Sequence, residues 1–191
     1  MKRILLMLAI HIAIVTARVD ILFSPRDNLQ MALIQLIDQE MASIDAAMYM
    51  LSDKLVAQAL LNAYIRGVKV RLVLDQCCMG EKFGKGLMLQ NNGITIFVHY
   101  APPINAFMTP IMHHKFFVFG KNCKTLQPLV WSGSYNATTT AAKFNDENVM
   151  ICDDPHAIAQ YRECFKALVT RLDKRYYFVG FDFEEDEAAI A

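Results

Sequence analysis

The feature that most constrains the fold of this chain is an alternation between short apolar segments and longer segments with helical character. The short segments are typical of strands and cover residues 19–24, 43–50, 68–74, 94–98, 113–119, 129–132 and 148–152. The predicted helices cover residues 28–41, 53–67, 82–90, 137–143 and 155–172. Strands and helices in this order predict an α/β fold, in which a mixed central β-sheet is flanked by helices on both faces.

Length and composition indicate one domain. The chain has 191 residues and is 54% hydrophobic, which is enough for one full core and short for two. We expect the domain to span residues 18–172 and residues 173–191 to form a partly acidic tail. Basic and acidic residues number 19 each, so the chain lacks the strong positive charge of an avid nucleic-acid binder. A locally basic groove is still allowed.

Residues 1–17 form a separate segment. Lys2 and Arg3 give it a basic start, and the apolar run that follows is too short to cross a hydrocarbon core of about 30 Å. Small residues at 15–17 then provide a cleavage site, so we expect a secretory signal peptide and export to the periplasm or the cell exterior. The alternatives are an uncleaved N-terminal anchor, which would tether the protein to a membrane, and a buried first element of the domain.

The cysteines indicate neither a metal site nor a complete set of disulfides. Their number, five, is odd, and their spacing matches no zinc motif. We therefore expect no metal and no other cofactor. The adjacent pair Cys77 and Cys78 falls in a predicted loop, where a redox role is open if the protein is exported.

The strongest functional motif is a histidine and a lysine at the start of a predicted buried strand. His113 and Lys115 are two residues apart and are expected on the same face of the strand, with His114 on the other. The strand continues as 116–119, which is apolar on both sides. A lysine there is costly unless an anion pairs with it, and a bound phosphate would satisfy it. In the alternative, Lys115 pairs with Glu147 or Asp146 and His113 is an ordinary core histidine.

Two further features favour the phosphate. The sequence Gly133-Ser134-Tyr135-Asn136 links a strand to a predicted helix, and such turns present backbone N–H groups to anions. Glu147 opens the next strand, where a carboxylate bonded to one imidazole nitrogen would leave the other free to attack phosphorus. The plainer alternatives are a capped turn and a surface glutamate.

These residues resemble the motifs of the phospholipase D superfamily, and most of all its single-motif branch of bacterial endonucleases and mitochondrial cardiolipin hydrolases. The similarity covers nearly all of residues 18–172 and is most specific at 112–116 and 131–138. It implies that His113 is the nucleophile, that Lys115, Ser134 and Asn136 bind the phosphate, and that Glu147 orients His113. The family uses two histidine–lysine sets and this chain has one, so the resemblance also implies a homodimer that completes the active site.

One position departs from the family pattern. The family has an aspartate five residues after the lysine, where this chain has Gly120. In the family that aspartate supports the local turn, and Asp146 or Asp75 are the candidates to replace it here.

The expected function is therefore a metal-independent phosphodiesterase. We expect an endonuclease, for which the available groove charges are Lys69, Arg71, Lys82, Lys85, Lys121, Lys124 and Lys143. A phospholipase D-type lipid hydrolase is the alternative, because 106–108 and 111–112 offer an apolar rim beside His113. A second alternative, prompted by Gly120, is a protein that binds phosphate-bearing ligands without cleaving them.

Overall fold

The computed structural model describes residues 17–80 and 84–179, so the predicted signal segment and most of the acidic tail lie outside it. The strands are β1 (Val19–Phe23), β2 (Ser43–Met48), β3 (Lys69–Asp75), β4 (Thr95–His99), β5 (Lys115–Phe119), β6 (Leu129–Gly133) and β7 (Asn148–Cys152). The α-helices are α1 (Leu29–Asp38), α2 (Lys54–Ile65), α3 (Gly86–Asn91), α4 (Thr139–Lys143) and α5 (Pro155–Val179). Within the described ranges, no helix is both long enough and apolar enough to cross a membrane.

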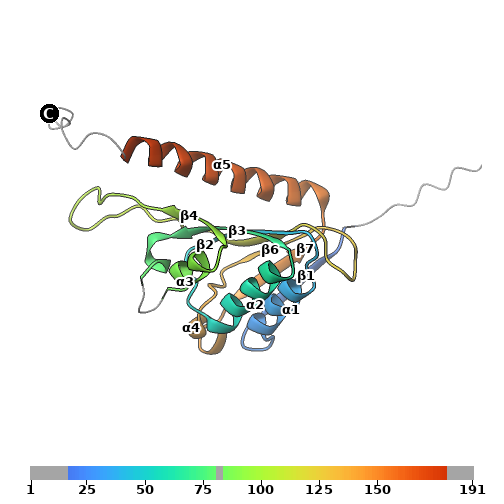
Figure 1. Cartoon of the computed structure of the whole chain (residues 1–191). Helices are drawn as coiled ribbons and strands as arrows, with labels where there is room; N and C mark the ends of the chain where they lie inside the picture. Colours follow the sequence, from blue (N-terminus) through green and yellow to red (C-terminus); the bar gives the residue numbers. More distant parts are fainter. Residues whose placement is uncertain (1–16, 81–83, 180–191) are drawn as a thin grey trace, which may run out of the picture.

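All seven strands form one mixed sheet in the order β1-β7-β6-β5-β2-β3-β4. β2, β3 and β4 are parallel, and the other neighbouring pairs are antiparallel. Helices α1 and α2 cover one face, and the long helix α5 crosses the other (Figure 1). The predicted α/β fold with helices on both faces is confirmed.

The core lies on both sides of the central strand β5. Phe117 and Phe119 belong to the buried cluster under α1 and α2, whereas Phe116 and Val118 belong to the cluster under α5. Successive strand residues point to opposite faces, and each of these four side chains is buried. A strand that is apolar on both faces has to be internal, as its sequence predicted.

Several element boundaries differ from the predicted ones. The sequence favours Asp27 as the cap of α1, but the cap is Asn28, whose side chain accepts from the Met31 amide. The Asp27 carboxylate accepts from the Phe23 amide and pairs with Arg26. Strand β5 begins at Lys115 rather than His113. Helix α5 runs beyond residue 172 to Val179, through a stretch that holds no glycine or proline to end it.

The pairing brings the sequence motifs to one edge of the sheet. Lys115 starts β5 opposite Met48, the last residue of β2. Asp75 ends β3 opposite His99, and Gly133 ends β6 opposite Val149 near the start of β7. The ends of six strands therefore deliver their flanking residues to a common edge.

Candidate active site at one edge of the sheet

His113 and Lys115 are in direct contact at this edge. The Lys115 Nζ atom lies 3.2 Å from His113 Nε2 and donates to the His113 carbonyl oxygen at 2.9 Å. Which of the two nitrogen atoms donates in the Nζ–Nε2 contact depends on the tautomer of the imidazole. Partial burial lowers the pKa of Lys115, and the nearby Glu147 opposes that shift. The lysine is thus a partly desolvated cation without a carboxylate in ion-pair contact, as a phosphate site requires.

Tyr49 completes the surroundings of His113. Its ring centroid lies 4.6 Å from that of His113, and Lys115 Nζ lies 5.4 Å from the same ring. His114 points the other way and packs edge-on against Phe116, on the face that α5 covers. The two histidine rings thus have different aromatic neighbours, although both line the pocket that also contains Lys115.

Glu147 is a buried carboxylate held by the neighbouring turn. The Ser134 hydroxyl donates to Glu147 Oε2 in a short hydrogen bond, and the Asn145 side chain donates to Oε1 at 3.0 Å. Ser134 also accepts from the Asn148 amide at 3.0 Å. His113 is not among the hydrogen-bond partners of Glu147 in this single chain, so the predicted orienting bond between them stays a prediction.

Gly133 permits the close approach of β6 and β7 that sets this turn. A Cβ atom at this position would lie 2.0 Å from the Asn148 carbonyl oxygen and 2.8 Å from Val149 Cα, closer than real contacts allow. Only glycine fits, which explains why it precedes Ser134. The glycine thereby brings the Ser134 hydroxyl within reach of Glu147.

Asn136 lies in an adjacent hollow. Together with Cys77 and Asn145 it lines a pocket beside the turn, whereas His113 and Lys115 line another pocket with Gly133. The buried Oδ1 atom of Asn136 has no hydrogen-bond partner. The chain therefore pairs His113 with Lys115 and Ser134 with Glu147, and leaves Asn136 as an unsatisfied polar group next to them.

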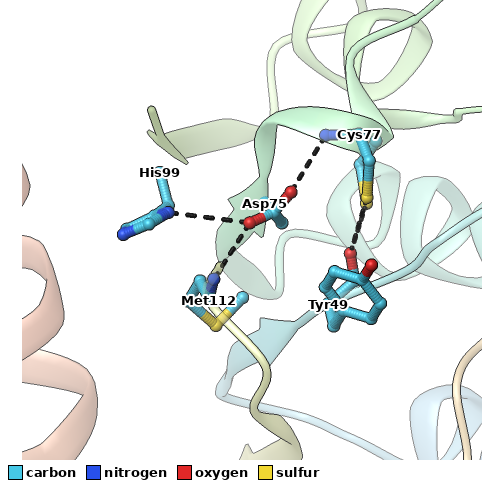
Figure 2. A network of polar contacts seen from close by, with 6 residues as sticks. Tyr49, Asp75, Cys77, His99 and Met112 are labelled. Carbon is cyan, nitrogen blue, oxygen red and sulfur yellow. Dashed lines mark hydrogen bonds and ion pairs between the residues drawn. The ribbon is translucent and has the colours of Figure 1, made fainter. Parts of the chain in front are cut away.

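A buried carboxylate fixes the segment that leads into His113 (Figure 2). Asp75 Oδ2 accepts from the Met112 amide at 2.9 Å, and Oδ1 accepts from the Cys77 amide at 3.1 Å. The His99 Nδ1 atom lies 3.6 Å from Oδ2. The Cys77 thiol contacts the Tyr49 carbonyl oxygen at 3.3 Å, and burial raises its pKa to about 12. A raised pKa lowers the thiolate fraction of Cys77 at neutral pH, and its contacts with Asp75 and Tyr49 are structural.

Gly120 lies at the opposite end of β5 from Lys115. The turn there is supported by Glu40, whose Oε1 atom accepts from the amides of Ala42, Ser43 and Lys121 at 2.8, 3.0 and 2.8 Å. Glu40 thus supports this turn, and compensation by Asp146 or Asp75 stays a prediction. The departure at residue 120 does not touch the His113 edge.

Sequence reasoning gave no individual role to Tyr49 or Asn145, and it considered Asp75 only as a substitute for the family aspartate, not as the anchor of the segment before His113. Tyr49 directly follows β2, whose last residue pairs with Lys115, and Asp75 is the last residue of the parallel strand β3. Their position at strand ends is the sequence feature that could have identified them as site residues. Among residues 17–80 and 84–179, no group of three His, Cys, Asp or Glu side chains is arranged to hold a metal ion.

A mixed sheet that gathers a histidine, a lysine, a buried glutamate and a Gly-Ser turn at one edge defines a domain of phospholipase D type. The family model described as "Cardiolipin synthase, PLD-like domain" matches residues 33–169. This chain belongs to that phospholipase D-like family of phosphodiesterases.

The chain is similar to proteins related in sequence and to solved structures with the same fold. "Phospholipase D" of Rickettsia prowazekii is 32% identical over 76% of this chain, and "Mitochondrial cardiolipin hydrolase" of Xenopus tropicalis is 27% identical over 76%. The chain spans 64% and 63% of their lengths, respectively. Among solved structures, NucT from Helicobacter pylori has a TM-score of 0.70 at 20% identity, covering 81% of this chain and 97% of its own. Nuc from Salmonella typhimurium, titled a phospholipase D family member, has 0.67 at 23%, covering 82% and 96%. These two likenesses concern the fold.

Proposed function

We propose that this protein is a metal-independent phosphodiesterase that works through a phosphohistidine at His113. The observation that carries the proposal is the contact of Lys115 Nζ with His113 Nε2 at 3.2 Å, beside the Ser134–Glu147 turn. It joins a nucleophilic nitrogen to a cation that draws in the phosphate. Asn136 is the proposed second phosphate ligand, because its side-chain NH₂ group can donate a hydrogen bond to a phosphate oxygen.

The proposed reaction has two steps. In the first, a ring nitrogen of His113 attacks phosphorus, the bond from phosphorus to the leaving oxygen breaks, and that oxygen takes a proton from a general acid. In the second, water attacks the phosphohistidine, its proton goes to the same group, and the phosphorus–nitrogen bond breaks. Lys115 offsets the phosphate charge in both steps, so the scheme requires no metal.

The general acid is the missing group, and a second copy of the chain supplies it in this proposal. The sequence contains one His-x-Lys motif, and two-fold symmetry would bring His113 of one protomer opposite His113 of the other. Co-expression of equal amounts of wild-type and His113→Ala chains tests this arrangement. Random pairing would leave about one quarter of wild-type activity, whereas independent sites would leave about half.

The nucleophile has a matched control next to it in the chain. We expect His113→Ala to lose phosphodiesterase activity in EDTA while its thermal unfolding stays unchanged, because His113 is exposed. His114→Ala, which changes a histidine on the other side, should keep activity. Equal activity in the two variants, or activity that returns only with added metal, would exclude this mechanism.

Of the two substrate classes, the surface supports a phospholipid more than a nucleic acid. Three of the basic residues expected in a groove lie at the far end of the sheet: Lys69, Lys121 and Lys124. Arg71 is paired with Asp45 at 2.6 Å, and Lys82 lies outside the described residues. Of the seven, this leaves Lys85 and Lys143, and neither lines the pocket of His113 and Lys115. Two relatives are named for phospholipid hydrolysis, so we propose a phosphatidyl substrate, and the expected endonuclease becomes the second candidate.

An assay of the purified protein in EDTA on phospholipid vesicles, single-stranded DNA, double-stranded DNA and RNA separates the two. Hydrolysis of phospholipid alone supports the first candidate, and hydrolysis of nucleic acid alone supports the second. Activity on none of these, with an intact fold, would contradict the enzyme proposal and favour the phosphate-binding alternative.

A further inference from the structure

We propose that the loop between β4 and β5 is a membrane-contact element that inserts its tip into the interfacial region of a phospholipid bilayer. This inference rests on the proposed function, because it concerns how the His113 site meets its substrate. The segment, residues 100–112, projects from the sheet next to β4 (Figure 1). It ends directly before His113.

The first observation is the composition of the loop surface. Residues 100–112 include no charged residue and no histidine. Phe107 at the tip is 99% exposed, and four more large apolar or aromatic side chains are about half exposed or more: Tyr100, Ile104, Met108 and Ile111. Single exposed apolar residues are ordinary, but a continuous uncharged and exposed group marks an interaction site.

The second observation concerns the backbone at the tip, which forms a hydrogen-bonded turn that pairs part of its own polar groups. Ile104 N–H donates to the Met108 carbonyl at 2.8 Å, and Met108 N–H donates back to the Asn105 carbonyl at 3.3 Å. The Asn105 side chain accepts from Phe107 N–H at 2.9 Å. Prolines at 102, 103 and 110 have no N–H to satisfy. Unpaired backbone groups are what excludes most loops from lipid, and this turn pairs the N–H groups of Ile104, Phe107 and Met108.

The third observation is continuity with the site. Met112 is buried, and its amide is fixed by Asp75, so the base of the loop is anchored to the sheet. Phe107 precedes His113 by six residues, a reach of at most about 20 Å. A lipid phosphodiester lies in the headgroup layer just outside the hydrocarbon. A tip held at that boundary would therefore place His113 at the depth of the phosphodiester.

The absence of charge distinguishes this contact from electrostatic adsorption. An uncharged loop should enter a bilayer of phosphatidylcholine as readily as one that contains anionic lipid, and salt should have little effect. A second copy of the chain is the competing occupant of the same surface, and the test must separate it from lipid.

A tryptophan placed at the tip reports the contact directly in the full chain. The single native tryptophan, Trp131, is buried and gives a constant background. With Phe107→Trp we expect emission to move to shorter wavelength on adding phosphatidylcholine vesicles and to be quenched by brominated acyl chains. Ile65→Trp, at a 72% exposed position at the end of α2, is the matched control and should not respond.

Three results would overturn the proposal. One is unchanged Phe107→Trp emission in vesicles that the protein has bound. Another is a response that requires anionic lipid and disappears in high salt. The third is a shift without lipid that grows with protein concentration, which would show that a second copy covers the tip.

The loop and the catalytic site are tested separately by activity. Phe107→Ser should weaken the partitioning of the loop into phosphatidylcholine on the order of tenfold, and hydrolysis of the vesicles should fall with it. Hydrolysis of soluble bis(p-nitrophenyl) phosphate should stay at the wild-type rate. If the wild type cleaves no phosphodiester, the proposed function fails, whereas the fluorescence result still decides whether the loop contacts lipid.

Discussion

Asp75 accepts a hydrogen bond from the backbone amide of Met112, and this contact fixes the residue directly before His113. The carboxylate is 2% exposed and also holds the Cys77 amide. One side chain at the end of β3 thus joins two loops at the catalytic edge (Figure 2). The position of His113 depends on a residue 38 positions earlier in the chain.

We predict that Asp75→Asn lowers both stability and catalytic efficiency. The amide keeps one acceptor oxygen, so one of two charge-assisted hydrogen bonds is lost and an NH₂ group faces a backbone N–H. A loss of about 2 kcal/mol in the free energy of unfolding is expected, measurable by urea denaturation. kcat/KM should fall further than the unfolded fraction explains, because His113 loses its anchor. Asp146→Asn, a change at an exposed aspartate, is the control, and equal behaviour of the two variants would contradict this role.

A second prediction concerns the hydroxyl of Ser134. Ser134→Ala leaves a Glu147 oxygen and the Asn148 amide without their partner. We expect about 1 kcal/mol of lost stability and reduced kcat, since Glu147 keeps only the Asn145 contact. Thr95→Ala, which removes an exposed hydroxyl at the start of β4, at the far end of the sheet, should be nearly silent. Unfolding midpoints and initial rates give the comparison, and an unaffected Ser134→Ala would show that the contact is dispensable.

The sequence predicted the sheet well because its strands carry local information. The run 116–119 has apolar side chains on both sides, so burial on both faces could be inferred without knowing the neighbours. The same holds for the start of α2, for which the sequence offered Ser52 or Asp53 as the cap and the structure has Asp53. Exact boundaries were harder: β5 begins at Lys115 because the residues before it are held by Asp75, a contact that no local pattern reveals.

The site was predictable residue by residue but not as a set of contacts. His113 and Lys115 belong to one segment, and their contact follows from it. The partners of Glu147 depend instead on how closely β6 and β7 approach at Gly133, which is a property of the sheet. At the Gly120 turn, Glu40 accepts from the amide of Lys121, which lies 81 residues later in the chain. A contact between residues so far apart cannot be inferred from the local sequence.

A third prediction separates stability from activity at this distant turn. Glu40→Ala removes the acceptor of three amides, and we expect a loss of about 3 kcal/mol in the free energy of unfolding. Per folded molecule, kcat should stay unchanged because the turn lies at the far end of β5. Asp38→Ala, which breaks only an exposed 3.9 Å ion pair with Arg66, should cost less than about 1 kcal/mol. A fall in kcat for Glu40→Ala under fully folded conditions would connect the turn to the site after all.

The last prediction follows from the lowered pKa of Lys115, whose main cause is desolvation. The charged form of Lys115 is disfavoured in the folded state, so it lowers the free energy of unfolding. This loss is fully present below the folded pKa and disappears as pH rises toward the ordinary lysine pKa of about 10.4. Stability should therefore rise slightly with pH in that window, and Lys115→Met should abolish the rise.

Activity should move in the opposite direction over the same window, because only the protonated lysine attracts a phosphodiester. We expect kcat/KM for bis(p-nitrophenyl) phosphate to fall on an alkaline limb below the ordinary lysine pKa. Lys115→Arg keeps the charge at all these pH values and should move the limb upward, even if its rate is lower. Lys143→Arg, at an exposed lysine, is the control and should leave the profile unchanged. An alkaline limb that stays in place in Lys115→Arg would assign it to another group and remove Lys115 as the phosphate-binding cation.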